Sequence, residues 1–136
     1  MSDEKMGPNG HWAWPLLADL GLGLLLALFS NGRWIIPAAA WLAPVFLLRA
    51  VHRLKSPFAL AGVLALFIAA ARLMLYGIIP SLLGPLTYAL TVYYGLLWFM
   101  PYLVDRLFIG RVGPRRFAST LIFPMAFVVF EYANAV

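Results

Sequence analysis

The chain lacks cysteine altogether and has few charged residues. Because none of its 136 residues is cysteine, disulfide bonds, thiolate metal sites and thiol nucleophiles are all excluded. Charged residues make up 11% of the chain and hydrophobic residues 64%. A typical soluble domain is about 25% charged and about 45–50% apolar. The polar residues are therefore too few to cover a water-exposed surface, and we expect lipid to be the solvent.

Sequence motifs of catalysis are also absent. No G-x-S-x-G elbow, H-E-x-x-H pair, Walker loop or paired-carboxylate arrangement occurs in the sequence. His11 and His52 lie in polar flanks, and neither has a second ligand at metal spacing, so we interpret both as solvated loop histidines. We therefore predict no catalytic residue, no cofactor site and no metal site, and we do not expect the chain to act as an enzyme alone.

Five apolar segments approach the length of about 20 mostly apolar residues that a bilayer crossing needs. We predict spans at about 14–29, 34–48, 58–76, 82–104 and 117–135, after a cytoplasmic tail at 1–13. The second contains Pro37 and Pro44, so we expect a helix that is kinked or spans the bilayer thinly. Ser56 and Pro57 predict the N-cap and first position of the third. The predicted fold class is all-α, a polytopic membrane bundle of about five transmembrane helices.

The basic residues lie in short runs between the apolar segments, and they are unevenly shared between the two sides. With five spans, eight of them fall on the side of the N-terminus and only Arg33 on the other. The eight are Lys5, Arg49, Arg53, Lys55, Arg106, Arg111, Arg115 and Arg116. The positive-inside rule therefore predicts a bacterial inner-membrane protein with its N-terminus cytoplasmic and its C-terminus extracytoplasmic. Because this pattern explains the net charge of +5, we predict no binding to nucleic acid.

Three charged residues lie inside the apolar segments, where a charge at mid-bilayer costs about 2.5–3.5 kcal/mol. Asp19 is about one turn into the first segment and fits the inner interface. Arg72 is near the outer end of the third segment, where it either extends to the interface or binds a lipid headgroup or a neighbouring carboxylate. Glu131, beside Tyr132, is at a similar depth in the fifth. Either Arg72 and Glu131 pair, or each is hydrated separately. Arg72, Glu131 and Tyr132 are the candidate contacts for a lipid headgroup or between helices.

Aromatic residues recur along the fourth segment. They are Tyr88, Tyr93, Tyr94, Trp98, Phe99 and Tyr102. We interpret them as packing residues of the bundle or as interface anchors rather than as a cofactor site. Small residues such as Gly21 and Gly23 in the first segment permit close approach of neighbouring helices.

Two stretches of the sequence, at residues 29–49 and 124–132, resemble parts of apolipoprotein N-acyltransferases. In the first, Phe29-Ser-Asn-Gly-Arg-Trp34 precedes Pro37, Ala40-Trp41-Leu42-Ala43-Pro44 and Arg49, like the loop, second helix and basic turn of those proteins. In the second, Pro124 precedes the pair Glu131-Tyr132, as a proline precedes a Glu-Trp or Glu-Tyr pair in their fifth helix. The order and spacing of the two stretches also fit.

The resemblance implies the membrane portion of a carbon–nitrogen hydrolase of lipoprotein biosynthesis. In that family a bundle anchors an extracytoplasmic nitrilase-like domain with a Glu-Lys-Cys catalytic set, which transfers an acyl chain from phospholipid to a lipoprotein. Because this chain has no cysteine, no catalytic residue carries over, and Pro124, Glu131, Tyr132 and Trp41–Pro44 correspond to scaffold positions. The implied partners are membrane lipid and a nitrilase-like domain, in cis or in trans.

Two other functions stay open. The chain could be a small stand-alone membrane protein that acts as an assembly or binding partner of a larger complex. It could also be a transporter, although the sequence has no detectable inverted repeat and its short second segment has no counterpart in the other half.

Overall fold

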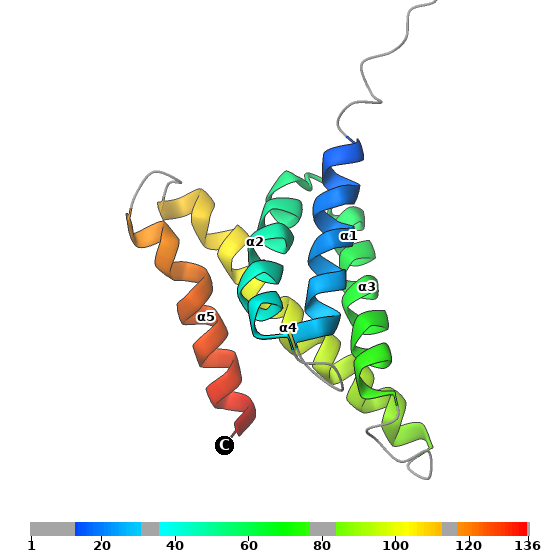
Figure 1. Cartoon of the computed structure of the whole chain (residues 1–136). Helices are drawn as coiled ribbons and strands as arrows, with labels where there is room; N and C mark the ends of the chain where they lie inside the picture. Colours follow the sequence, from blue (N-terminus) through cyan, green and yellow to red (C-terminus); the bar gives the residue numbers. More distant parts are fainter. Residues whose placement is uncertain (1–12, 31–35, 77–83, 113–116, 136) are drawn as a thin grey trace, which may run out of the picture.

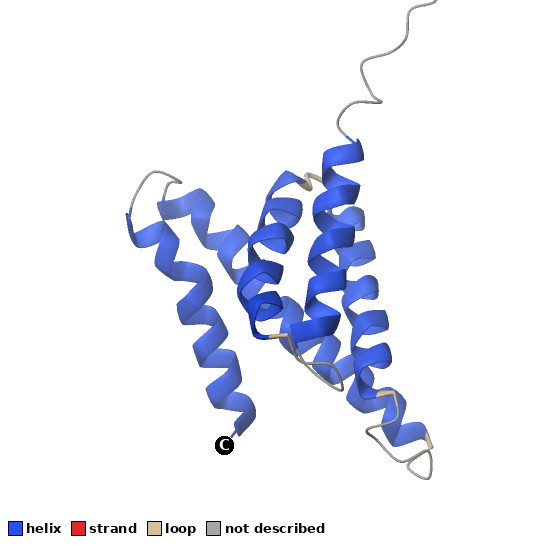
Figure 2. Ribbon diagram, in the orientation of Figure 1, coloured by secondary structure: helices blue, strands red, loops and turns tan. Residues whose placement is uncertain are grey.

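The structure, a computed structural model, describes residues 13–30, 36–76, 84–112 and 117–135, and these form five α-helices and no strand (Figures 1 and 2). The helices are α1 (Ala13–Ser30), α2 (Pro37–Arg53), α3 (Pro57–Leu75), α4 (Pro85–Val112) and α5 (Phe117–Ala135). The predicted all-α class is confirmed for these residues. The predicted tail at 1–13, apart from Ala13, lies outside the described residues, as do His11 and Arg33.

Two helices extend beyond the apolar segments that predict them. The sequence predicts ends near residues 48 and 104, whereas α2 continues to Arg53 and α4 to Val112. Hydropathy locates the apolar part of a helix, but the backbone hydrogen bonds continue into polar residues, and basic side chains favour the last turn through the helix dipole. Arg49, His52 and Asp105 are consequently helical residues rather than loop residues.

The start of α3 is as predicted. The Ser56 hydroxyl oxygen accepts a hydrogen bond from the backbone N–H of Phe58 at 3.2 Å, and Pro57 is the first helical residue. In α2, Pro37 likewise occupies the first turn, where its missing N–H costs nothing, and Pro44 lies inside the helix.

The helices pack as two hairpins, α1–α2 and α3–α4, with α5 against α4 and to one side of α1–α3 (Figure 1). Glycine permits the closest approach within each hairpin. A Cβ atom on Gly23 would lie 2.7 Å from Cγ of Leu47, and one on Gly95 would lie 2.7 Å from Cα of Ile68. The expected packing role of small residues is therefore met at Gly23, whereas Gly21 faces open space.

The core is a cluster of aliphatic and aromatic residues from α2, α3, α4 and the α2–α3 connection. Its buried members are Leu47, Val51, Leu54, Val63, Phe67, Phe99 and Tyr102. The Phe67 ring lies 5.5 Å from that of Phe99 and 5.3 Å from that of Tyr102, and Tyr102 lies 4.9 Å from Phe123 of α5. Part of the aromatic series of α4 thus packs inside the bundle, as predicted, and these rings connect α3, α4 and α5.

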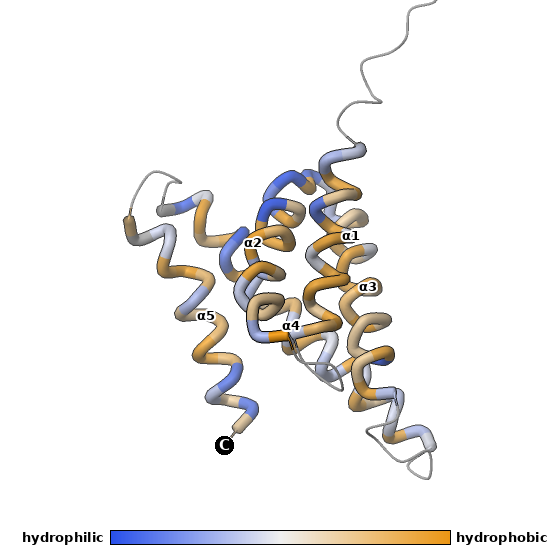
Figure 3. The backbone as a smooth tube through the Cα atoms, viewed as in Figure 1, coloured by the Kyte–Doolittle hydropathy of each residue, from blue (hydrophilic) through white to orange (hydrophobic). Residues whose placement is uncertain are grey.

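Apolar residues predominate along the five helices (Figure 3), and many of their large side chains are exposed. Trp41 is 82% exposed, Phe58 87% and Phe117 79%. Among the described helices, α3 alone is both long and apolar enough to cross a membrane by itself, with a mean hydropathy of 2.3. Trp14–Ser30 and Ser119–Ala135 are apolar but shorter. Among the five predicted spans, the one that forms α3 is therefore the one whose described helix meets both criteria for crossing a membrane.

Candidate functional site

Charged side chains from three helices meet at one end of the bundle, in what we call the polar cluster. Its members are Asp19 of α1, Arg49, His52 and Arg53 of α2, and Asp105 and Arg106 of α4. The start of α1 therefore lies beside the end of α2, and the ends of α2 and α4 lie together. Figure 3 shows hydrophilic residues at this end of α1 and α2, and further ones near the C-terminal end of α5.

The centre of the polar cluster is a contact between α2 and α4. Nε2 of His52 lies 2.7 Å from Oδ2 of Asp105, within hydrogen-bond distance, and Asp105 is 3% exposed. Beside it, Nη1 of Arg106 donates to the backbone carbonyl of Val51 at 3.2 Å. A buried carboxylate needs such partners because leaving it unpaired carries a large desolvation cost.

Asp19 holds the other side of the cluster. Its Oδ2 atom lies 2.7 Å from Nη1 of Arg53 and 3.7 Å from Nε of Arg49. The carboxylate is buried, whereas both arginine side chains remain partly exposed. Neither contact has the geometry of a hydrogen bond, so the attraction is ionic. The arginines that neutralise Asp19 come from the next helix, and its predicted position at the inner interface stays a prediction.

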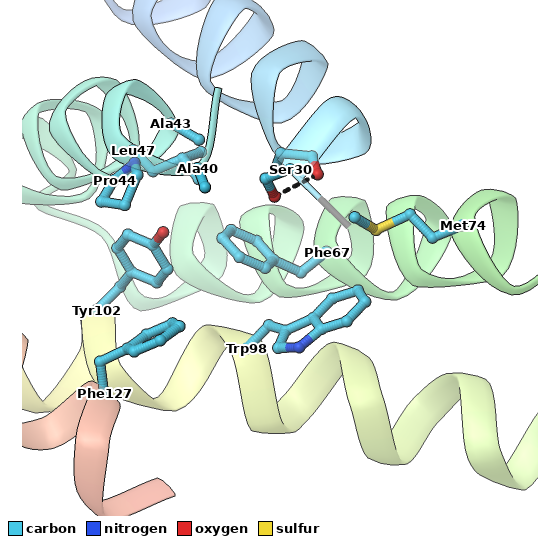
Figure 4. Close-up of a pocket in the computed structure, with 11 residues that line it drawn as sticks. Ser30, Ala40, Ala43, Pro44, Leu47, Phe67, Met74, Trp98, Tyr102 and Phe127 are labelled. Carbon is cyan, nitrogen blue, oxygen red and sulfur yellow. Dashed lines mark hydrogen bonds between the residues drawn. The ribbon is translucent and has the colours of Figure 1, made fainter. Parts of the chain in front are cut away.

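An apolar cavity of about 100 Å³ lies between the helices (Figure 4), and none of the residues that line it belongs to the polar cluster. All five helices contribute to its wall, which is formed by Ala27, Ser30, Ala40, Ala43, Pro44, Leu47, Phe67, Met74, Trp98, Tyr102 and Phe127. The small side chains of α2 make room on one side, and the rings of α3, α4 and α5 form the other. Because α5 enters this wall through Phe127, the wall is complete only when α5 is packed in place.

The cavity offers little polar chemistry to a ligand. The Ser30 hydroxyl already donates to the carbonyl of Ala27 at 2.7 Å. The Tyr102 hydroxyl is the other polar side-chain group of the wall that is close to the cavity in Figure 4. An engineered apolar cavity of about 150 Å³ in another protein stays dry and binds benzene, so a cavity of this kind favours a small apolar group over water.

The three residues that the sequence singles out for polar contacts are not brought together. The Arg72 guanidinium carbon lies 5.6 Å from the centre of the Tyr88 ring, so its partner is a ring of α4. Glu131 and Tyr132 are exposed near the end of α5. Within the described residues, no ion pair joins Arg72 to Glu131, and the predicted alternative of a direct pair is not found. Contact of any of the three with a lipid headgroup stays a prediction.

The interpretation of His52 as a solvated loop histidine is wrong. The residue lies in α2 and pairs with Asp105, an acidic residue that the sequence interpretation missed. The only signal for the pair is that both residues flank predicted spans on the same side of the membrane. Hydropathy does not reveal which flanking residues face each other, because that depends on how α2 and α4 pack.

Among the described residues, no three His, Asp or Glu side chains lie together as metal ligands would. The His52–Asp105 pair has neither a nucleophile nor a third ligand among the contacts of the polar cluster. Its geometry therefore supports joining of helices rather than catalysis.

Comparison with known proteins adds no relative. No family model, no curated protein and no solved structure matches this chain.

Proposed function

We propose that the chain is a polytopic helix bundle of the bacterial inner membrane that anchors a nitrilase-like acyltransferase domain and forms a lipid-facing wall at its substrate entrance. The N-terminus is cytoplasmic and the C-terminus extracytoplasmic. The bundle performs no chemistry itself, and its substrate-facing element is the apolar cavity, which receives part of a phospholipid acyl chain.

The observation that carries this proposal is the separation of charge from apolar surface. All the ion pairs of the described residues lie in the polar cluster, at one end of the bundle. Away from that end, side chains such as Trp41, Leu73 and Val128 are largely exposed. In water this much exposed apolar surface would drive aggregation, whereas in lipid it is the ordinary outer surface of a protein.

The lengths of the helices support the same arrangement. At about 1.5 Å per residue, the 28 residues of α4 extend about 42 Å, which exceeds the hydrocarbon thickness of about 30 Å. The additional length of α4 allows Asp105, Arg106 and Arg111 to lie outside the hydrocarbon layer, at its boundary with the headgroups. The 17 residues of α2 extend about 26 Å, so α2 crosses the bilayer thinly and places Arg49 and Arg53 near the same boundary.

The resemblance to N-acyltransferases supports the role of the cavity. Ala40, Ala43 and Pro44 belong to the Trp- and Pro-containing stretch that carries the resemblance, and all three line the cavity. Phe127 lies between Pro124 and Glu131, in the second such stretch. The two resembling stretches thus meet at one place in the fold, on opposite walls of the cavity.

The topology is tested by fusing a reporter that is active only outside the cytoplasm after Lys55, after Tyr76 and after Val136. We expect no activity after Lys55 and activity after the other two. Activity after Lys55 would mean that α2 does not cross, and inactivity after Val136 would remove the extracytoplasmic anchor point.

The anchoring role is tested with membranes that contain the chain and a separately added nitrilase-like domain. We expect phospholipid-dependent acyl transfer that requires both components. Correct topology without any stimulation of transfer would instead favour a stand-alone assembly partner of a different complex.

Occupancy of the cavity is tested through Trp98, which lines it. In a variant whose other four tryptophans are phenylalanine, we expect bromine atoms on phospholipid acyl chains to quench Trp98 fluorescence. Ala40→Phe fills the cavity and should reduce this quenching. Ala38→Phe, on the same helix but outside the cavity wall, should leave it unchanged, and equal quenching in the two variants would contradict the proposal.

A further inference from the structure

The polar cluster carries more positive charge than its own carboxylates neutralise. Among the described residues, the end of the bundle that holds it has five basic side chains, which are Arg49, Arg53, Lys55, Arg106 and Arg111. The carboxylates at this end are Asp19 and Asp105, and Asp105 is already engaged by His52. An additional anion would therefore be attracted to this end of the bundle.

The geometry points to a binding site for an acidic phospholipid headgroup, formed by Arg49 and Arg53. We propose that the two guanidinium groups bind the phosphodiester of such a lipid, on the side of the bundle where the proposed topology places the cytoplasmic leaflet. This inference rests on the proposed membrane embedding, but not on the acyltransferase role.

Asp19 positions the two arginines for this contact. Both guanidinium groups approach the same buried oxygen, Oδ2, from side chains that are 57% (Arg49) and 39% (Arg53) exposed. Arg49 makes its contact through Nε, at 3.7 Å, and its two terminal nitrogens have no acceptor among the described residues. Arg49 and Arg53 are four residues apart on α2 and therefore lie on one face of the helix. The Asp19 carboxylate therefore holds both guanidinium groups in place and leaves the terminal N–H groups of Arg49 able to donate to another anion.

Phosphate suits these donors better than other anions at this depth. Arginine presents a planar set of N–H groups that bind two oxygens of a phosphate at once. At a membrane surface the available phosphates are those of lipid headgroups, and basic pockets between helices on the cytoplasmic side bind acidic lipids elsewhere. Trp14, at the start of α1 and 76% exposed, suits the headgroup level next to this site.

The test is retention of phosphatidylglycerol by the full-length protein. The protein is reconstituted into bilayers of phosphatidylcholine with a minor fraction of phosphatidylglycerol and then extracted gently. Bound lipids are counted by native mass spectrometry. We expect preferential retention of phosphatidylglycerol, reduced about fivefold in affinity by Arg49→Gln. Because Arg53 still neutralises Asp19 in that variant, the fold should be preserved.

Two further variants distinguish specific binding by Arg49 from non-specific electrostatic attraction of the lipid to this end of the bundle. Arg111→Gln removes the same charge from the same end of the bundle, but from a side chain that lies over the Phe108 ring, and it should retain phosphatidylglycerol normally. Arg49→Lys keeps the charge but loses the planar donor set, and it should lose retention. Equal effects of Arg49→Gln and Arg111→Gln, or full retention in Arg49→Lys, would overturn the proposal.

The same preparation distinguishes the other outcomes. Competition by inorganic phosphate as strong as that by phosphatidylglycerol would mean a site for free phosphate and would overturn the lipid assignment. Failure of the protein to stay in carbonate-washed membranes would overturn the membrane proposal together with this one. Stable insertion without lipid preference would overturn only the headgroup site.

Discussion

The two ends of the bundle are joined by different kinds of contact. At one end, the polar cluster connects α1, α2 and α4 through charged groups, with His52 and Asp105 at 2.7 Å. Toward the other end, the described residues pack mainly through apolar side chains, with a Tyr93–Asn134 hydrogen bond between α4 and α5, and the cavity lies among them. In lipid, apolar surfaces gain little by meeting each other, so polar contacts and close packing decide which helices associate. In the proposed membrane arrangement, the polar end therefore fixes which helices associate, and the apolar end contains the cavity proposed to receive an acyl chain.

Among substitutions that test this difference between the two ends, His52→Ala is expected to lower the stability of the protein most. The change leaves the buried Asp105 carboxylate without its partner, and we expect the free energy of unfolding to fall by about 3 kcal/mol. Denaturation by sodium dodecyl sulfate in mixed micelles measures this. His52→Gln, which keeps a nitrogen donor, should recover much of the loss. Equal destabilisation by both substitutions would show that ring packing, not the hydrogen bond, matters at this position.

A smaller effect is expected from Gly95→Ala, which alters the apolar packing instead. The new Cβ atom would lie 2.7 Å from the backbone Cα of Ile68, so α3 and α4 must move apart. We expect a loss of about 1–3 kcal/mol in the same denaturation assay. Gly62→Ala is the matched control on α3, because a Cβ atom there meets nothing within 4 Å. A loss as large in the control would contradict the close α3–α4 contact.

The smallest effect is expected at Arg72, beyond the polar cluster. Its contact with the Tyr88 ring is partly exposed, so Arg72→Gln should cost about 0.5–1 kcal/mol. Tyr88→Leu should cost a similar amount, and the double variant should cost no more than either alone.

Glu131→Ala should change stability by less than about 0.5 kcal/mol. Strong coupling between Arg72 and Glu131 in a double-mutant cycle would indicate that the two side chains interact, which would contradict the structure.

The sequence predicts the helices better than their contacts. Apolar length locates all five helices, and Ser56-Pro57 locates the start of α3. Apolar length does not locate the ends of α2 and α4, because helical hydrogen bonding continues into charged residues, where the hydropathy is low. The charge count predicts that the basic residues at these two ends lie on one side of the membrane, which stays a prediction; that the ends of α2 and α4 meet is seen in the structure alone.

The candidate site is less predictable for a physical reason. Whether a flanking histidine is solvated or paired depends on the rotation of two helices about their axes, and the low amphipathicity of these helices leaves that rotation unspecified. His52 and Asp105 are 53 residues apart in the chain and face each other only once α2 and α4 have packed. The cavity is hidden for the same reason, since its wall combines residues from all five helices.

The way α5 is attached has a consequence for biosynthesis. None of the polar cluster belongs to α5, which packs mainly on α4 through the Tyr102–Phe123 ring contact and a hydrogen bond from the Tyr93 hydroxyl to Asn134 at 3.0 Å. As the chain emerges from the ribosome, every member of the polar cluster is synthesised before Phe117. In the proposed membrane arrangement, α1–α4 can therefore associate first and α5 can join them afterwards. Among the five described helices, the last in the chain is also the one that completes the cavity wall.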